Sequence, residues 1–259
     1  MSTDPFSLFS LKGKVAFITG ASAGIGYAIA QTFAHAGAEI AFGYNSSSTA
    51  VQTAAALAKA AGVTVEAYKC PVSDPEAVAS TFACALEKFG RIDIVVSNAG
   101  ITWTSGELIG PPDHKAWKQI MDVNLDGSYY VAKEAGKVFK SQGSGSLIFT
   151  SSISALIVNI PQKQAAYNAS KAAVTHLAKS LAVEWASFAR VNSVSPGYTI
   201  TELTRFADAG MRDEWVRRIP MGREALPAEL VGAYLYLASD ASTYTTGSDI
   251  IIDGGYTLV

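Results

Sequence analysis

Short, mostly apolar runs alternate with longer stretches of helical periodicity along most of the chain. The apolar runs are rich in Val, Ile and Phe, and they cover 15–19, 40–44, 65–68, 92–96, 147–150, 190–194 and 249–252. Runs that are apolar at consecutive positions, rather than at alternate ones, are typical of strands in a parallel sheet covered on both faces. The pattern therefore predicts seven buried parallel strands.

The stretches between these runs have the apolar spacing of amphipathic helices. They cover 25–35, 49–61, 75–88, 114–140, 164–187 and 227–239. Gly37, Gly62 and Gly90 follow three of them, as helix-ending residues do. No linker-like segment and no repeat of fixed period interrupts the alternation. The sequence therefore predicts one α/β domain over residues 1–259, with a doubly wound, seven-stranded parallel sheet flanked by helices.

Two segments rich in Gly and Pro do not fit this alternation: 101–113 and 196–222. Each follows a predicted strand, and in open α/β sheets ligands bind at the carboxyl ends of the strands. Strands and helices account for the rest of the chain, so no separate substrate domain is left. We therefore expect the substrate site to be built from these two segments and from 153–164.

Composition narrows the class of partner. Hydrophobic residues make up 49% of the chain and charged residues 16%, below the roughly 25% charge of an average soluble domain, which excludes a disordered chain. Lys and Arg number 20 against 22 Asp and Glu, a formal net charge of −2. Without a surplus of positive charge, we expect no nucleic-acid partner.

Metal, redox-thiol and membrane functions are also disfavoured. The two cysteines, Cys70 and Cys84, do not have the spacing of a metal site or a disulfide framework, and so few cysteines are typical of a reducing compartment. No apolar stretch approaches the roughly 18 residues of a membrane span, and the first residues do not resemble a signal peptide. The sequence predicts a soluble, cytoplasmic protein without a metal ion.

A glycine-rich turn follows the first predicted strand and leads into the first helix. Gly20, Gly24 and Gly26 have GxxxGxG spacing, which only partly meets the GxGxxG pattern of dinucleotide sites. Glycines allow a sharp turn and a close approach of the backbone to a pyrophosphate, whose charge the helix N-terminus favours. The turn indicates a dinucleotide site, and a plain tight turn is the alternative.

The same turn also satisfies the GxSxG pattern of an α/β-hydrolase nucleophile, with Ser22 as the serine. An esterase would need an acid and a histidine later in the chain. The histidines are His35, His114 and His176, and none lies near the last strands. An α/β-hydrolase esterase is therefore a remote alternative.

Tyr167 and Lys171 lie four residues apart, on one face of a predicted helix. Tyr129 and Lys133 have the same spacing, but Tyr167 follows a strand that ends in a pair of serines, the second of which is Ser152. A phenol has a pKa near 10, and a neighbouring ammonium favours the phenolate. This set predicts a tyrosine general acid/base, with the serine hydrogen-bonded to a carbonyl oxygen.

Taken in order, the motifs resemble those of the short-chain dehydrogenase/reductase family from about residue 11 to 255. They are Thr-Gly-x-x-x-Gly-x-Gly at 19–26, Asn98-Ala99-Gly100, Asn124, Ser152, Tyr167 with Lys171, Pro196-Gly197 and Asp253-Gly254-Gly255. Any one of these is weak, whereas the ordered set is specific. The resemblance implies a Rossmann-like fold that binds a nicotinamide cofactor.

The resemblance also implies roles for four residues. Tyr167 is the acid/base, and Ser152 orients the substrate. Lys171 binds the nicotinamide ribose and lowers the tyrosine pKa, and Asn124 positions a water in a proton relay. Ser152 is separated from Tyr167 by slightly more residues than is common in the family, so Ser154 is a minor alternative for the serine.

Three further segments, 101–103, 158–161 and 188–198, are similar to fungal NADPH-dependent carbonyl reductases of the sorbose reductase and mannitol dehydrogenase type. The similarity implies reversible reduction of a ketone or ketose to a secondary alcohol. The substrate-pocket residues expected on this basis are Trp103, Ser152, Val158, Ile160 and Tyr198. The alternative is a noncatalytic NADP-binding sensor or scaffold domain, which would not need the four catalytic residues.

The end of the second predicted strand bears on which nicotinamide cofactor is bound. An NAD site has an acid there for the ribose 2′-hydroxyl, whereas residues 43–48 contain no carboxylate and no Lys or Arg occurs from 15 to 58. We therefore expect NADP(H) rather than NAD(H), with Asn45, Ser46 and Ser47 as neutral phosphate ligands. Helix capping is the structural alternative for these three residues.

The remaining cofactor contacts and the assembly are those that the family resemblance implies. The contacts are Gly20, Ser22, Gly24, Ile25, Gly26, Val72, Asn98, Ala99, Gly100, Tyr167, Lys171, Pro196, Gly197, Thr199 and Thr201. Pro71 stands where many relatives carry an Asp or Asn toward the adenine, so only backbone contact by Val72 is expected there. The expected assembly is a homotetramer.

Overall fold

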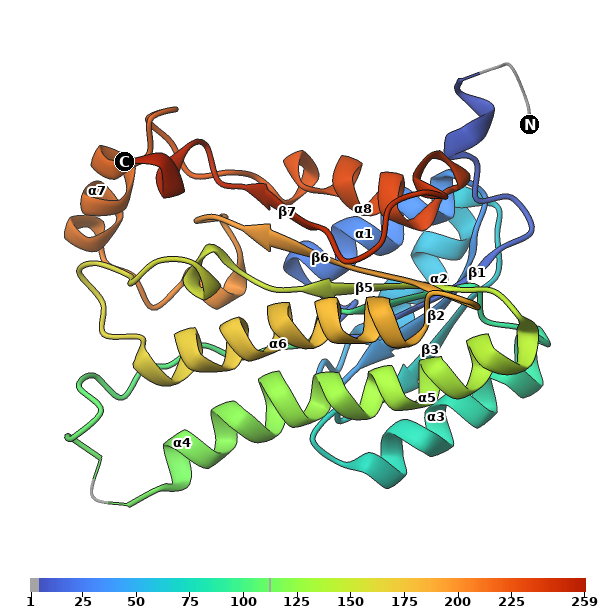
Figure 1. Ribbon diagram of the computed structural model, residues 1–259, viewed down its shortest axis with the longest axis horizontal. Helices are drawn as coiled ribbons and strands as arrows, with labels where there is room; N and C mark the ends of the chain where they lie inside the picture. The colour runs from blue at the N-terminus through green and yellow to red at the C-terminus, as the bar shows by residue number, and fades with distance from the viewer. Residues whose placement is uncertain (1–4, 112) are drawn as a thin grey trace.

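A seven-stranded parallel sheet is the central element of the computed structural model, which describes residues 5–111 and 113–259 (Figure 1). Residues 1–4 and Pro112 of the predicted domain lie outside the described residues. The strands are β1 (Val15–Ile18), β2 (Glu39–Tyr44), β3 (Val65–Lys69), β4 (Ile94–Ser97), β5 (Ser146–Thr150), β6 (Arg190–Pro196) and β7 (Asp249–Ile252). Their order is β3-β2-β1-β4-β5-β6-β7. The predicted doubly wound fold is confirmed.

Helices cover both faces of the sheet (Figure 1). One face carries α1 (Gly24–His35), α2 (Ala50–Ala61) and α8 (Val231–Ala238), which pack on the core around Ile18, Ile40 and Ile148. The other carries α3 (Pro75–Phe89), α5 (Gly127–Gln142) and α6 (Ala165–Glu184), which pack around Phe17, Val95 and Phe149. Adjacent strand residues thus bury opposite faces, which explains why the strands are apolar at consecutive positions.

The sheet order places the switch point of this open α/β fold between β1 and β4. These strands are neighbours, with Ile18 opposite Val96, and the chain leaves them toward opposite edges of the sheet. Such a switch point opens a crevice beyond the carboxyl ends of the strands. The glycine turn follows β1 and Asn98 follows β4, so the fold brings both motifs to this crevice.

A capping side chain and terminal glycines mark the ends of two helices. The Asp74 carboxylate caps α3 by accepting from the backbone N–H groups of Glu76 and Ala77. Gly62 and Gly90 end α2 and α3 in the left-handed conformation, as predicted for helix-ending glycines.

Three segments differ from the sequence-based expectation. The stretch predicted as one helix over 114–140 is α4 (Lys115–Ile120), a π-helical turn (Met121–Asp126) and α5. The stretch predicted over 227–239 is a 3₁₀ turn (Pro227–Glu229) followed by α8. The segment 196–222 contains an unpredicted helix, α7 (Ala209–Arg218), which buries Trp215 and is otherwise strongly polar. A helix with one buried side chain has no apolar stripe to reveal it.

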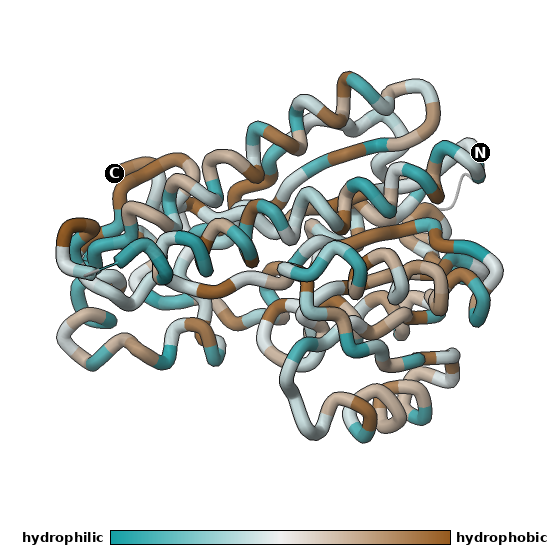
Figure 2. The backbone as a smooth tube through the Cα atoms, turned by 90° about the horizontal axis from the view of Figure 1, so that it is seen from below, coloured by the Kyte–Doolittle hydropathy of each residue, from teal (hydrophilic) through white to brown (hydrophobic). Residues whose placement is uncertain are grey.

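Along the helices seen in Figure 2, hydrophobic residues alternate with hydrophilic ones, as expected for helices with one buried and one solvated side. Within 5–111 and 113–259, none of the helices combines the length and the apolar character required to cross a membrane.

Candidate active site

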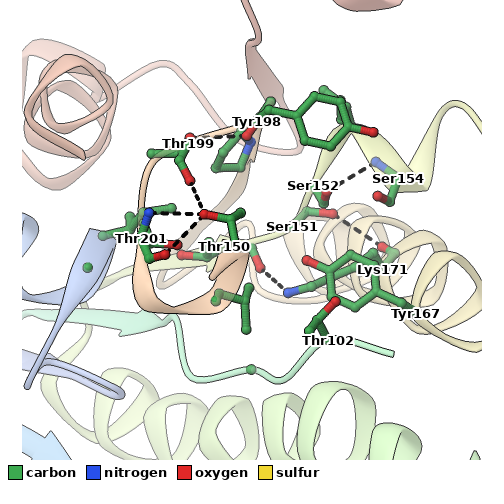
Figure 3. Close-up of a pocket in the computed structure, with 18 of the residues that line it drawn as sticks. Thr102, Thr150, Ser151, Ser152, Ser154, Tyr167, Lys171, Tyr198, Thr199 and Thr201 are labelled. Carbon is green, nitrogen blue, oxygen red and sulfur yellow. Dashed lines mark hydrogen bonds between the residues drawn. The ribbon is translucent and has the colours of Figure 1, made fainter. Parts of the chain in front are cut away.

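A cavity of about 290 Å³ lies beyond the carboxyl ends of β1, β4, β5 and β6 (Figure 3). The predicted site residues that line it are Gly20, Gly24, Ile25, Gly26, Asn98, Ala99, Gly100, Ser152, Tyr167, Lys171, Pro196, Gly197, Tyr198, Thr199 and Thr201. The segments 101–113, 153–164 and 196–222 all contribute to its walls. The cavity therefore has one end at the glycine turn and another among the predicted substrate loops.

The glycine turn forms a backbone cradle at the start of α1. Gly20 and Gly24 have φ values of +65° and +54°, a region that favours glycine. A Cβ on Gly26 would collide with the carbonyl oxygen of Gly20, so the helix can pack this close only without a side chain. The cap residue Ala23 offers no side-chain cap to the first N–H groups of the helix. The cradle and the helix N-terminus fit the pyrophosphate of a dinucleotide.

Asn98 and Thr19 hold this cradle to the end of β4. The Thr19 hydroxyl accepts from the backbone N–H groups of Asn98 and Ala99, each at 3.0 Å. The Asn98 amide in turn donates to the carbonyl oxygens of Thr19 at 3.0 Å and Gly20 at 3.4 Å. These bonds make the turn and the Asn98-Ala99-Gly100 segment one rigid unit.

Tyr167, Ser152 and Lys171 meet at the centre of the cavity (Figure 3). The Lys171 ammonium donates to the carbonyl oxygen of Thr150 at 2.8 Å and lies 5.6 Å from the centre of the Tyr167 ring. The Ser152 hydroxyl lies close enough to Tyr167 to lower the pKa of the phenol, and it accepts from the backbone N–H of Ser154 at 3.1 Å. The alternative serine, Ser154, donates instead to Asn159 at 2.8 Å. The geometry favours Ser152 as the partner of the tyrosine.

Burial determines how tightly Tyr167 and Lys171 hold their protons. It raises the pKa of Tyr167 to about 12, against a lowering by the hydrogen bond with Ser152. It lowers the pKa of Lys171 to about 8. The raised pKa of Tyr167 differs from the expected lowering by the ammonium, because burial is the largest effect on the phenol. At neutral pH Tyr167 is protonated and Lys171 is mainly charged.

Asn124 lies just behind the cavity, in the π-helical turn. Its amide donates to the carbonyl oxygen of Ile101 at 3.0 Å and to the Ser170 hydroxyl at 3.2 Å, and it accepts from the Ile101 N–H at 2.9 Å. A Cβ on Gly100 would lie 3.3 Å from the Asn124 side chain and 3.6 Å from the Lys171 nitrogen. Asn124 thus joins the start of the 101–113 segment to α6, close to Lys171.

The end of the cavity lined by the segments 153–164 and 196–222 is an aromatic and amide cluster. The Tyr198 ring stacks on Trp215 with centroids 4.1 Å apart and meets Tyr256 edge-on at 5.3 Å. The Tyr198 hydroxyl accepts from Asn159 at 3.2 Å and Gln162 at 3.1 Å. Tyr198 was expected here, whereas the amides and Trp215 were not. Their only sequence signal was their place in the segments 153–164 and 196–222.

Several predicted site residues do not line this cavity. Trp103 is buried against Ile120 and Ala166, and its indole donates to the carbonyl oxygen of Gly106 at 2.7 Å. Thr102, next to it, faces the cavity instead. Val158 and Ile160 line a second cavity with Arg217 and Arg218.

The remaining predicted cofactor residues do not line the cavity, and they follow β1, β2 and β3 at the carboxyl edge of the sheet. Ser22 belongs to the glycine turn, and Asn45, Ser46 and Ser47 form the chain directly after β2. Val72 follows β3 and packs against Gly127. Because β2 and β3 neighbour β1, these residues extend the same edge of the sheet.

The esterase alternative has no triad. Ser22 is outside the cavity, and His35, His114 and His176 do not line it. His35 ends α1, the helix that begins beside Ser22, so the two are separated by the length of that helix. No cluster of metal-binding side chains occurs within the described ranges.

Sequence comparison identifies the family of the chain. A sequence model described as enoyl-(acyl carrier protein) reductase matches residues 20–257. The chain belongs to the short-chain dehydrogenase/reductase family, as the ordered motifs predict.

Individual relatives are similar over nearly the whole chain. The chain is 57% identical to a sorbose reductase of Candida albicans, covering 99% of this chain and 92% of that protein. It is 56% identical to a probable NADP-dependent mannitol dehydrogenase of Yarrowia lipolytica, covering 96% of this chain and 89% of that protein. The crystal structure of an NADPH-dependent 3-quinuclidinone reductase from Rhodotorula rubra has a TM-score of 0.96 and 45% identity, covering 100% of this chain and 97% of that chain.

Proposed function

We propose that this protein is an NADP(H)-dependent carbonyl reductase that reduces a ketone or ketose to a secondary alcohol, and that acts in reverse as an alcohol or polyol dehydrogenase. The observation that carries the proposal is a single cavity that joins the glycine cradle to Tyr167, Ser152 and Lys171. A carbonyl reductase needs both the glycine cradle and this group of side chains. The cradle holds the cofactor that provides the hydride, and the side chains orient the substrate and provide a proton. The names of the sorbose reductase and mannitol dehydrogenase relatives support the ketose class.

The residues at the centre of the cavity take complementary roles. The nicotinamide, when bound, supplies the hydride to the carbonyl carbon. Ser152 donates a hydrogen bond to the carbonyl oxygen, and Tyr167 transfers its phenolic proton to that oxygen. The charged Lys171 then faces the phenolate and favours it electrostatically, and it also binds the ribose. Asn124 holds the segment after Gly100 beside Lys171, where a proton-relay water would lie.

The preference for NADP(H) rests on the carboxyl end of β2. No acid occurs there, and the side chains of Asn45 and Ser46 are exposed, as groups that contact a 2′-phosphate must be. The cradle formed by Gly20, Gly24 and Gly26 holds the pyrophosphate, and the remaining contacts are those that the family resemblance implies. The names of NADP- and NADPH-dependent relatives support this choice.

We further propose that the chain forms a single domain and that the protein works as a homotetramer in the cytoplasm. The low content of charged residues supports buried subunit faces, and the absence of cysteine pairs supports a reducing compartment.

Replacing the acid tests the reaction directly. Tyr167→Phe keeps the ring and removes the proton, so we expect turnover of ketones and ketoses to be lost while NADPH binding persists. Tyr129→Phe, which removes the hydroxyl of an exposed tyrosine, is the matched control. Steady-state assays with NADPH and NADH on a panel that includes sorbose and fructose measure the outcome. Turnover retained by Tyr167→Phe would overturn the assignment of the acid.

The same assays distinguish a sensor or scaffold domain from an enzyme. The presence of Asn124, Ser152, Tyr167 and Lys171 together disfavours a noncatalytic domain, which has no use for the set. Tight NADPH binding by the natural chain without turnover of any ketone or ketose would favour it.

A further inference from the structure

A tyrosine hydroxyl on α8 is connected to the glycine turn by hydrogen bonds through side chains at the ends of β5 and β4. Tyr234 lies on α8 and is fully buried among apolar side chains. Its hydroxyl is 2.9 Å from the Thr150 hydroxyl. The Thr150 hydroxyl donates to the Asn98 amide oxygen at 3.2 Å. Because an amide oxygen can only accept, the proton of Tyr234 points to Thr150.

Strand geometry explains why the contact forms. Side chains alternate between the two faces of a strand, so Ser146, Ile148 and Thr150 of β5 face α8. The Ser146 hydroxyl donates to the Leu237 carbonyl oxygen on α8 at 2.8 Å, and Thr150 meets Tyr234 one helical turn earlier. Ser97 of β4 pairs with Phe149 of β5, so Asn98 stands beside Thr150 at the strand ends.

The chain of hydrogen bonds continues into the glycine cradle. Asn98 accepts from Thr150 with its amide oxygen and donates with its amide nitrogen to the carbonyl oxygens of Thr19 and Gly20. With its oxygen held by Thr150, the amide can present its N–H groups to the cradle in only one orientation. A series of hydrogen bonds therefore connects Tyr234, through Thr150 and Asn98, to Gly20.

We propose that Tyr234 is a positioning residue for the cofactor site, acting through Thr150 and Asn98 to hold the glycine turn in the shape that binds the pyrophosphate of NADP(H). The inference rests on the proposed cofactor and adds a residue remote from it. A phenylalanine would fill the same apolar space, so core packing alone does not account for the hydroxyl.

The same helix provides a matched control. The Tyr236 hydroxyl is also hydrogen-bonded to a threonine, Thr245, at 2.7 Å. Thr245 lies before β7 and does not line the cavity. Tyr236→Phe therefore removes a comparable hydrogen bond from α8 and leaves intact the series of hydrogen bonds that connects Tyr234 to Gly20.

The test measures NADPH affinity by fluorescence titration and amide hydrogen exchange over 19–26 without cofactor. One neutral hydrogen bond corresponds to roughly a two- to tenfold change in an equilibrium constant. We expect Tyr234→Phe to weaken NADPH binding by about that factor and to speed exchange over 19–26, with kcat at saturating NADPH nearly unchanged. Tyr236→Phe should change neither readout. Thermal unfolding shows whether each variant is folded.

A double-mutant cycle separates positioning from a general loss of stability. Thr150→Val should weaken NADPH binding, Thr150→Ser should restore it, and adding Tyr234→Phe to Thr150→Val should cause little further loss. If Tyr234→Phe binds NADPH as the natural chain does, or if its effect adds fully to that of Thr150→Val, Tyr234 is only a core residue. If the natural chain itself does not bind NADPH, the proposed function fails rather than this step.

Discussion

Lys171→Met tests how much stability the protein gives up to keep a charged ammonium in its active site. The Lys171 side chain is 5% exposed, and burial lowers its pKa to about 8 from 10.5. A pKa difference of one between folded and unfolded states corresponds to about 1.4 kcal/mol. The charged form therefore costs the folded state roughly 3 kcal/mol.

The pH at which this cost disappears follows from the sign of the shift. Below about pH 8 both states are protonated and the folded state bears the full cost. Between pH 8 and 10.5 the folded state releases its proton before the unfolded state does, so the free energy of unfolding rises with pH. Methionine has no proton to lose. The stability of Lys171→Met relative to the natural protein should therefore fall by roughly 3 kcal/mol across this window.

Urea unfolding at fixed protein concentration, measured at several pH values from 7 to 10.5, gives this difference directly. The difference between the two proteins cancels the titration of the other groups. Lys179→Met, which replaces an exposed lysine on the same helix, controls for the loss of an ammonium and the gain of a methionine. A difference between Lys171→Met and the natural protein that stays constant with pH would refute the reasoning.

Three further substitutions test separate parts of the site. Gly26→Ala places a Cβ against the Gly20 carbonyl, so we expect roughly 1–3 kcal/mol of destabilisation and loss of NADPH binding; unchanged affinity would contradict the cradle. Ser46→Asp brings a carboxylate toward the 2′-phosphate, so the kcat/KM ratio should shift toward NADH, more than for Ser48→Asp; equal ratios would remove Ser46 from phosphate binding. Tyr198→Phe leaves the Asn159 and Gln162 amides without their shared acceptor and should lower kcat/KM for the ketone about tenfold. Val158→Ala, at the second cavity, should leave kcat/KM for the ketone unchanged. If Val158→Ala lowered kcat/KM and Tyr198→Phe did not, the substrate would bind at the second cavity instead.

The strands, and the placement of Ser152, Tyr167 and Lys171 around one cavity, could be predicted because both depend on regular geometry. A buried parallel strand must be apolar on both faces, and β7 has the predicted bounds while β4 shifts by at most two residues. Tyr167 was distinguished from Tyr129 by the serine pair at the end of a strand. In the fold, Ser152 follows the end of β5 and lies near the phenol of Tyr167. Strand ends and helix faces fix the direction of a side chain, so placement in the sequence predicts placement in space.

Loop side chains have no such period, and the prediction is weaker there. Thr102 faces the cavity whereas its neighbour Trp103 turns into the core, and nothing in the sequence sets that choice. The pKa of Tyr167 could not be foreseen for a related reason, because it depends on how completely the site is enclosed. The π-helical turn around Asn124 was not predicted, because the stretch 114–140 was expected to form one continuous helix.

The aromatic cluster of Tyr198, Trp215 and Tyr256 has a consequence for how substrate preference can change among related proteins. These side chains come from three distant parts of the chain and form a small core separate from the two that hold the sheet. The cofactor end, by contrast, is made of backbone turns locked to β1 and β4. Substitutions in the small core can reshape the proposed substrate wall while the sheet and the glycine cradle stay intact. Selection for a new carbonyl substrate can thus proceed in small steps, each of which preserves a folded, cofactor-binding protein.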